Sequence, residues 1–443
     1  MSLLDWLRPG LKFKRWILLG VAGILLLSYG IAFFIMNGIN QNILTSLGFY
    51  SIILGMAFLI MSAALIIRTL INALNDSGLR SHLDSKRLRS ILIERKYLEK
   101  GPKLVAIGGG TGLSTMLRGL KSFTANITAV VTVSDDGGGS GVLRQDLGML
   151  PPGDIRNCIL ALARTEPILE KLLQYRFEEG RLNGQNFGNL FLAAMTRVCG
   201  SFDEAVKKMS DVLAVTGHVL PVTIDDIRLC AELEDKSLVF GECNIVSESK
   251  SRNKRINRVF IEPSNAHALP EVISTIKDAD VIILGPGSLY TSVIPNLLVK
   301  GVSEAIRESN ALKVYVCNIM TQKGETDNYS VYDHIRAIED HVGLGYIDYC
   351  IVNKGRIKDI LIHKYNLDGA QRVNVDEYKL LRRKINLVKS DLLGVEKGFL
   401  RHDPQKLALT ILKLINEEIN LKEKKKVIEY LYIKDKIKKI ASS

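Results

Sequence analysis

Two glycine-rich segments of the sequence have the composition of loops that hold phosphate groups. Residues 108–112 read GGGTG and residues 285–292 read GPGSLYTS, each after a short apolar run. Glycine lets the backbone approach a ligand, and the N–H groups at the start of a following helix attract anions. A tight turn needed only for helix packing is the alternative for the first segment. The predicted ligand-binding residues here are Gly109, Gly110, Thr111, Gly112, Gly285, Gly287, Ser288, Tyr290, Thr291 and Ser292.

The spacing of these glycines excludes two common nucleotide motifs. No Gly-Lys-Ser/Thr follows the first segment, so it is not a Walker A loop, and its last glycine, Gly112, comes too early for the GxGxxG pattern of dinucleotide-binding proteins. The ring of Tyr290 is available for stacking in the second segment. A phosphate-bearing ligand of another class is therefore indicated.

An acidic segment, residues 134–141 (SDDGGGSG), lies between the two glycine loops and carries Asp135 and Asp136. Adjacent carboxylates suit a divalent cation or the hydroxyl groups of a substrate, whereas a solvated Asp-Gly turn is the plainer alternative. Asp154 in residues 151–157 (PPGDIRN) is a third candidate, although capping of a helix alone would explain it. Mg²⁺ at Asp135, Asp136 and Asp154 is the one cofactor that these residues suggest, and Asp135 and Asp136 are the catalytic candidates if the chain is a transferase.

Amide and hydroxyl side chains occur in two further segments that begin or follow predicted elements. Asn186 and Asn189 lie in residues 184–190 (GQNFGNL), and Asn318 and Thr321 follow the apolar run at residues 314–317. Such groups form hydrogen bonds with the base or sugar of a nucleotide. We count all four among the predicted ligand-binding residues.

These loops require a scaffold that brings them together, and the apolar runs supply it. Short β-branched runs occur at residues 104–107, 127–133, 281–284, 314–317 and 347–352, separated by helical stretches. That spacing predicts an α/β fold with a Rossmann-like, doubly wound, mostly parallel sheet. Ligands bind beyond the carboxyl ends of the strands in such sheets, which is where the candidate loops fall.

The N-terminal part of the chain predicts a transmembrane hairpin at residues 16–67. Residues 16–36 and 47–67 contain no charged side chain, and at about 1.5 Å per residue each spans the roughly 30 Å of a bilayer's hydrocarbon core. Buried core helices normally keep a polar face, whereas these segments are apolar on all sides. A cleaved signal peptide would account for the first segment alone, and it fits even that segment poorly. Cations flank the hairpin but not its loop, so both termini and the main domain are expected on the cytoplasmic side of the plasma membrane.

The remaining organisation follows from charge and composition. Residues 1–15 form a basic cytoplasmic N-terminus, residues 68–102 a basic juxtamembrane helix or linker, residues 103–415 the nucleotide-binding α/β domain, and residues 416–443 a lysine-rich helix or tail. The six cysteines show no zinc or disulfide spacing. Much of the net charge of +12 lies in the flanking segments, so no nucleic-acid partner is expected.

Taken in order, the blocks GGGTGLS, SDDGGGSG, PPGDIRN, GQNFGNL, GPGSLYTS and NIMTQKGET resemble the signature blocks of the CofD-like superfamily, in its YvcK branch, the gluconeogenesis factors. The resemblance covers residues 103 to about 415 and implies a Rossmann-like fold. Phospholactate transferases of this superfamily move a phospholactyl group from a guanylyl donor to a deazaflavin hydroxyl with a divalent metal. The YvcK branch is associated instead with UDP-N-acetylglucosamine, cell shape and growth on gluconeogenic carbon sources.

By position, the resemblance implies that residues 108–112, Asn186, Asn189 and residues 285–292 surround a nucleotide diphosphate. It implies that Asp135, Asp136 and Asp154 lie at the acceptor or metal end. Two departures bear on sugar preference: residues 137–140 lack an expected second serine, and Gln185-Asn186 stand where relatives often have histidine and a small residue.

Two functions follow as hypotheses. The first is a membrane-anchored binder of a UDP-sugar that signals to envelope-synthesis proteins, and the second is a metal-dependent transferase of the phospholactate type. A nicotinamide-dependent oxidoreductase rests on fold analogy alone. A homodimer is also expected.

Overall fold

The computed structural model describes residues 13–37, 42–76, 98–164, 167–396 and 398–422, and the chain divides into two compact units, residues 1–94 and 95–443. Residues 38–41 of the predicted hairpin loop and most of the predicted juxtamembrane segment fall outside the described residues, whereas residues 42–46 of that loop belong to the second long helix. The same holds for residues 423–443 of the predicted lysine-rich tail.

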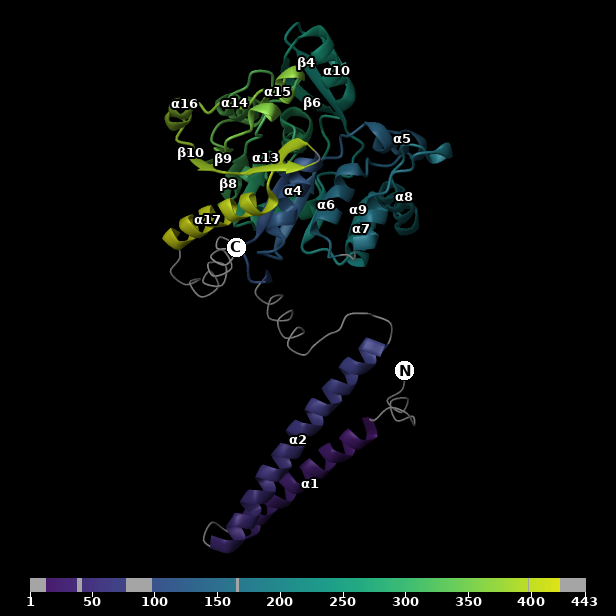
Figure 1. The fold of residues 1–443 in the computed structure, drawn as a ribbon, viewed down its shortest axis with the longest axis vertical. Helices are drawn as coiled ribbons and strands as arrows, with labels where there is room; N and C mark the ends of the chain where they lie inside the picture. The colour runs from purple at the N-terminus through teal and green to yellow at the C-terminus, as the bar shows by residue number, and fades with distance from the viewer. Residues whose placement is uncertain (1–12, 38–41, 77–97, 165–166, 397, 423–443) are drawn as a thin grey trace. The chain divides into compact units, whose positions relative to one another are not determined.

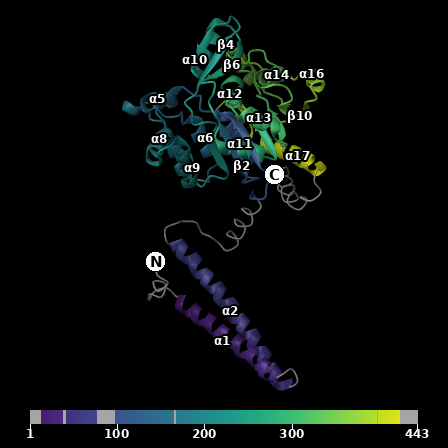
Figure 2. The same ribbon diagram turned by 180° about the vertical axis from the view of Figure 1, so that it is seen from behind.

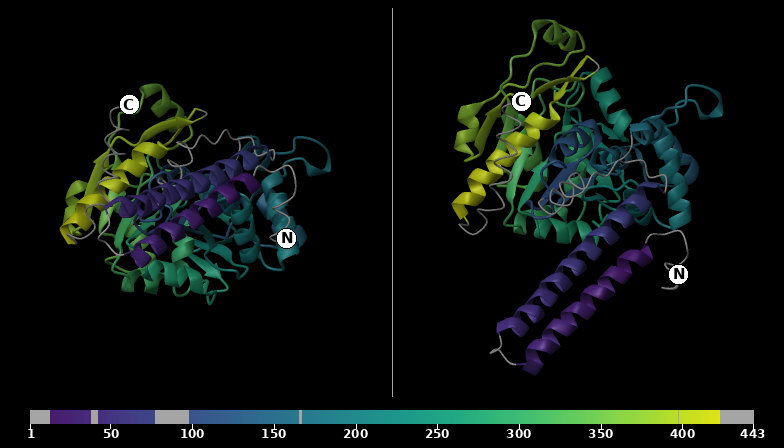
Figure 3. Two further views of the ribbon diagram at one scale, coloured as in Figure 1. Left: turned by 90° about the horizontal axis from the view of Figure 1, so that it is seen from below. Right: turned by 60° about the horizontal axis from the view of Figure 1, so that its bottom comes forward.

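The first unit contains two long helices, α1 (Phe13–Asn37) and α2 (Asn42–Asp76), which lie side by side (Figures 1 and 3). The stretches Arg15–Phe33 and Leu47–Arg68 are long and apolar enough to cross a membrane, and 11% of the residues in each are buried. Their apolar side chains therefore face outward, as a lipid environment would favour. The helix α2 extends beyond the predicted end at residue 67.

Small residues set the contact between α1 and α2. A Cβ atom at Gly23 would lie 2.9 Å from the carbonyl oxygen of Gly55, and one at Gly55 would lie 2.8 Å from that of Gly23. The hydroxyl of Ser62 donates to the carbonyl oxygen of Trp16 at 2.6 Å. Close backbone approach through glycine and side-chain hydrogen bonds are the features that hold helices together in lipid.

Gly55→Leu is expected to separate α1 from α2, because the new side chain would overlap the backbone of Gly23. Cysteines introduced at Trp16 and Ser62 report the contact through their oxidative cross-link, mapped by mass spectrometry of the full-length chain in membranes. We expect at least a fivefold loss of cross-link with Gly55→Leu. The control Met56→Leu, at a neighbouring position that is about half exposed, should cross-link like the parent. Equal cross-linking in the two variants would contradict the glycine contact.

The second unit is built on a seven-stranded sheet in the order β10-β9-β8-β7-β1-β2-β3, and all adjacent pairs are parallel. The strands are β1 (Leu104–Gly108), β2 (Ile127–Val131), β3 (His218–Pro221), β7 (Val281–Leu284), β8 (Leu312–Val316), β9 (Tyr349–Asn353) and β10 (Asn386–Ser390). Five of them confirm the predicted runs. The edge strands β3 and β10 were not predicted.

Helices cover both faces of this sheet, as a doubly wound fold requires. Figure 1 has α4 and α17 in front of the strands, and Figure 2 has α11 and α12 in front of the opposite face. The helices are α4 (Gly110–Leu120), α5 (Gly138–Leu147), α6 (Gly153–Leu162), α7 (Pro167–Gln174), α8 (Phe187–Cys199), α9 (Phe202–Val212), α10 (Glu242–Arg252), α11 (Pro270–Lys277), α12 (Ile294–Leu298), α13 (Val302–Glu308), α14 (Val331–Val342), α15 (Asp359–Leu367), α16 (Glu377–Arg382) and α17 (Pro404–Lys422).

The second unit also contains two smaller sheets, which the sequence did not predict. A three-stranded antiparallel sheet has the order β5 (Leu238–Phe240), β4 (Arg228–Leu233), β6 (Ile256–Glu262). A hairpin pairs β11 (Leu393–Glu396) with β12 (Phe399–His402). The hairpin and α15 enclose a satellite apolar cluster of Ile319, Met320, Ile357 and Leu400, separate from the main core. This cluster forms one wall of the site described next.

Candidate functional site

The order of the strands creates a crevice at the carboxyl end of β1. The chain runs from β1 through β2 to β3 on one side, and from β7 through β8 and β9 to β10 on the other. The loops that follow β1 and β7 therefore diverge at a topological switch point, where α/β sheets bind ligands. These are the two glycine-rich segments of the sequence.

The two loops approach each other so closely that glycine is required in them. A Cβ atom at Gly112 would lie 2.5 Å from the carbonyl oxygen of Pro286, a distance that side chains do not reach. Gly110 and Gly285 have φ values of +66° and +75°, a region that favours glycine. In addition, Asn296 donates from Nδ2 to the carbonyl oxygens of Gly108 and Ser292, at 3.1 and 2.7 Å, and ties the two loops together.

A cavity of about 260 Å³ opens beside these loops. Nine of the predicted ligand-binding residues line it: Gly109, Gly110, Thr111, Gly112, Gly287, Ser288, Ser292, Asn318 and Thr321. The loop after β8 is fastened to the loop after β7, because Asn318 donates to the carbonyl oxygen of Gly287 at 2.9 Å and Gln322 donates to the hydroxyl of Ser288 at 2.8 Å. The sequence therefore located two walls of the cavity.

Tyr365, Leu400, Arg401 and His402 form a third wall that sequence reasoning missed. They come from α15 and β12, far along the chain from the glycine loops. The hydroxyl of Tyr365 accepts a hydrogen bond from the backbone N–H of Leu400 at 2.9 Å, which fixes the ring against the hairpin. The sequence carries only one local signal here: Asp403-Pro404 is a typical helix start, which marks an element boundary directly after residues 399–402 but does not reveal the strand.

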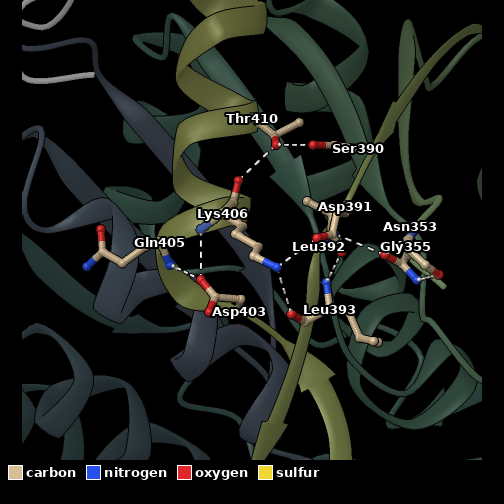
Figure 4. Close-up of polar contacts among 10 residues, drawn as sticks. All are labelled: Asn353, Gly355, Ser390, Asp391, Leu392, Leu393, Asp403, Gln405, Lys406 and Thr410. Carbon is tan, nitrogen blue, oxygen red and sulfur yellow. Dashed lines mark hydrogen bonds and ion pairs between the residues drawn. The ribbon is translucent and has the colours of Figure 1, made fainter. Parts of the chain in front are cut away.

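A polar network anchors that third wall to the main sheet (Figure 4). The Oδ1 atom of Asn353, at the end of β9, accepts hydrogen bonds from the N–H groups of Gly355 and Leu392, both at 3.0 Å. Lys406 of α17 donates to Oδ2 of Asp391 at 2.8 Å. Asp403 accepts from the N–H groups of Gln405 and Lys406 and so caps α17. The hairpin that carries Arg401 is therefore held at both of its ends.

Five predicted ligand-binding residues do not line this cavity: Asn186, Asn189, Gly285, Tyr290 and Thr291. Asn186 caps α8 by accepting from the N–H of Asn189 at 3.2 Å, and Asn189 accepts from Nη1 of Arg156 at 2.8 Å. Thr291 donates to Oε1 of Glu325 at 3.3 Å. These contacts assign a structural role to each side chain within the protein. The ring of Tyr290 lines a second cavity.

Asp154 lies directly behind the first glycine loop. Its Oδ2 atom would be 2.5 Å from a Cβ atom at Gly109, and its carboxylate accepts a hydrogen bond from the backbone of Gly110. Burial, with a contribution from Asp135, raises the pKa of Asp154 to about 6. Burial also raises the pKa of Asp135. The N–H of Gly137 donates a hydrogen bond to Oδ1 of Asp135 at 2.9 Å and opposes this rise.

The adjacent carboxylates Asp135 and Asp136 accept hydrogen bonds from different segments of the chain. Asp136 accepts a hydrogen bond from the N–H of Cys243 at 3.0 Å, at the start of α10. Burial and the nearby Asp135 raise the pKa of Glu242 well above its ordinary value. In the described part of the chain no three His, Cys, Asp or Glu side chains come close enough to share a metal ion. The carboxylates in this geometry therefore do not form a preassembled metal site, and a metal at Asp135, Asp136 and Asp154 stays a prediction.

Glu325 supports the second glycine loop from below. Its two carboxylate oxygens accept from the N–H of Tyr290 and the hydroxyl of Thr291, both at 3.3 Å, at the start of a single π-helical turn, Leu289–Val293. Burial raises the pKa of Glu325 to about 7, although these hydrogen bonds oppose the rise. Among the described residues no cation pairs with Glu325, so hydrogen bonds connect it to the loop that borders the cavity.

Comparison with known proteins places this site in a family. Residues 104–393 match the family described as 2-phospho-L-lactate transferase CofD. The chain belongs to the CofD family. A relative from Clostridium acetobutylicum, grouped with the gluconeogenesis factors, is 50% identical over 439 residues, which cover 99% of this chain and 97% of that protein. The gluconeogenesis factor of Bacillus subtilis is 46% identical over 317 residues, 71% of this chain and 99% of its own.

A solved CofD-type structure agrees with the fold. The crystal structure of a UPF0052-family protein from Bacillus halodurans is 48% identical, with a TM-score of 0.67, and the match covers 70% of this chain and 99% of that one. The Bacillus relatives are thus matched over almost their full length by part of this chain, whereas the Clostridium relative matches nearly all of it. The predicted resemblance to the CofD-like superfamily, in its gluconeogenesis-factor branch, is confirmed.

The raised pKa values of Asp154 and Glu325 predict a characteristic pH dependence of stability. The folded-state pKa values of about 6 for Asp154 and about 7 for Glu325 exceed the ordinary values of 3.8 and 4.5, so the folded chain keeps protons that the unfolded chain releases. Their contribution to stability is fully present below about pH 4 and is lost as the pH rises through 6 to 7. The loss is about 3 kcal/mol for each group.

Glu325→Gln should therefore gain thermal stability relative to the parent chain as the pH rises from 5 to 8. Melting curves of the full-length chain in detergent, recorded across this range, measure the difference. Asp211→Asn is a matched control because Asp211 is exposed on α9, and its difference from the parent should stay constant. A Glu325→Gln curve parallel to the parent curve would show that Glu325 does not titrate in this range.

Asn353→Ala should loosen the third wall of the cavity. The substitution leaves the N–H groups of Gly355 and Leu392 without their acceptor, at a cost of about 1–3 kcal/mol each if they stay buried. Hydrogen exchange of residues 393–402 should accelerate at least tenfold. Lys406→Met is the comparison, because its partly exposed ion pair with Asp391 is worth at most about 1 kcal/mol. Equal exchange in both variants would contradict the anchoring role of Asn353.

Proposed function

We propose that the cavity beside the glycine loops binds a UDP-sugar of the UDP-N-acetylglucosamine type. The observation that supports this proposal is that two kinds of wall face one cavity. The loops at residues 109–112 and 286–288 present glycine backbone suited to a diphosphate, and Tyr365 and Arg401 present planar groups suited to a base. Membership in the gluconeogenesis-factor branch supports the same ligand class. The ligand bridges the main sheet and the β11–β12 hairpin.

We further propose that α1 and α2 anchor the protein in the plasma membrane, with both termini and the α/β unit in the cytoplasm. The uncharged spans and the cations that flank them support this orientation. The ligand site then acts near the leaflet where envelope precursors are assembled from nucleotide sugars. In this proposal the protein supports envelope synthesis and cell shape during gluconeogenic growth, as a homodimer that contacts envelope-synthesis proteins.

Isothermal titration of the full-length chain in detergent with UDP-N-acetylglucosamine tests the ligand. We expect saturable binding, a loss of at least tenfold in affinity with Arg401→Gln, and weaker binding of GDP. Arg382→Gln is the control, because Arg382 is exposed on α16 and contacts Tyr378 rather than the cavity. Binding of guanosine nucleotides together with no binding of uridine compounds would reject the proposal.

A transferase of the phospholactate type is the second candidate, favoured by Asp135, Asp154 and Glu242, three partly buried carboxyls that interact electrostatically and have raised pKa values. Incubation with Mg²⁺, a nucleotide-linked donor and a deazaflavin acceptor, followed by mass spectrometry, tests it. Turnover that Asp135→Asn abolishes, with nucleotide binding retained, would establish this activity. Stabilisation by a UDP-sugar without any product would support the binding function instead.

A further inference from the structure

One buried side chain on the third wall of the first cavity has a polar atom without a partner. His402 ends β12, lines the cavity and is 7% exposed. Unpaired polar atoms inside a protein are rare, and each one needs an explanation. In the described part of the chain five buried side-chain atoms lack a hydrogen-bond partner, and of their residues only His402 lines this cavity: Arg156 Nε, Gln185 Oε1, Asn296 Oδ1, His334 Nε2 and His402 Nε2.

The surroundings of the imidazole ring determine which of its nitrogens carries the proton. The backbone of Cys317, directly after β8, forms a hydrogen bond with the ring that favours protonation, so its carbonyl oxygen is the acceptor. Because Nε2 has no partner, Nδ1 is the donor in this bond. Burial lowers the pKa of His402 to about 4, although the bond to Cys317 opposes the fall. The ring is therefore neutral near pH 7, and Nε2 presents a lone pair that can only accept a hydrogen bond.

The charges around the cavity keep the ring in this form. Among the described residues that line the cavity, Arg401 is the only one with a charged side chain. A carboxylate beside the ring would favour a second proton, whereas a cation on the same wall does not. A buried acceptor that the protein leaves unpaired is costly, and a donor on the ligand removes the cost. The group that fits Nε2 is thus an N–H or O–H of the ligand.

We propose that Nε2 of His402 accepts a hydrogen bond from the N3–H group of a uracil base and so selects uridine over cytidine nucleotides. This inference rests on the proposed function, since it names the contact that makes the first cavity specific for a uridine compound. Uracil carries a hydrogen at N3, whereas cytosine carries a lone pair there, which the lone pair of Nε2 repels. The planar ring of Tyr365 on the same wall favours a base over a sugar hydroxyl as the partner.

Three nucleoside diphosphates test this contact on the parent protein without any substitution. Isothermal titration of the full-length chain in detergent compares UDP, CDP and 3-methyluridine 5′-diphosphate, which share the ribose and the diphosphate and differ at the edge of the base. We expect UDP to bind at least tenfold more tightly than either of the others, because a site built around one hydrogen bond rejects an analogue that cannot form it. Equal affinity for UDP and the methylated compound would overturn the inference.

Substitutions at His402 assign the discrimination to this side chain. His402→Phe keeps a planar ring without the acceptor, so affinity for UDP should fall at least tenfold while affinity for CDP is not reduced. His402→Gln, whose amide oxygen can replace Nε2, should restore at least a fivefold preference for UDP. His363→Phe is the matched control, because His363 is exposed on α15 outside the cavity, and it should bind like the parent. Circular dichroism melting curves verify that each variant is folded.

The outcomes separate this inference from the proposed function. A preference for UDP over CDP that His402→Phe leaves unchanged would overturn the inference while the proposed function stands. The inference would also be overturned if His402→Phe removed discrimination against 2′-deoxyuridine 5′-diphosphate but kept the base preference, because the acceptor would then contact the ribose. If the parent bound no uridine compound, the proposed function itself would fail, and this inference with it.

Discussion

The backbone contact between the loop after β1 and the loop after β7 determines where everything else in the α/β unit can lie. Gly112 and Pro286 touch main chain to main chain, and Asn296 holds both loops from the side of α12. Because no side chain fits between them, the loops present N–H groups and hydroxyls to the same space. The switch point of the parallel sheet then becomes a phosphate-type cradle rather than a packed turn.

Two carboxyl groups lie behind the loops of this cradle, while Arg401 lines its opposite wall. Asp154 lies behind the first loop and Glu325 below the second, and burial raises the pKa of both. A carboxyl group that is protonated can accept and donate hydrogen bonds without repelling a bound anion. With a pKa of about 7 Glu325 is about half protonated at pH 7, whereas Asp154, with a pKa of about 6, is mostly ionised there. Lowering the pH through this range favours the neutral forms.

The sequence predicted what depends on local patterns. The five central strands, both glycine loops and the apolar hairpin each have a signature within a few residues, and the structure places nine of the predicted residues around one cavity. The third wall, with Tyr365 and Arg401, could not be found in that way. It reaches the site through long-range contacts, such as those of Asn353 with Leu392 and of Lys406 with Asp391, which leave no periodic trace in the sequence.

The position of Tyr290 shows why a motif locates a loop better than it locates a side chain. A tyrosine next to a phosphate-type loop invites a stacking role, yet the π-helical turn rotates its ring to the far side, where it bonds to Tyr329 and packs against His341. Sequence spacing cannot report this rotation, because an α-helical turn would contain the same residues. The turn gives one segment two faces, with Ser288 and Ser292 on one cavity and Tyr290 on the other.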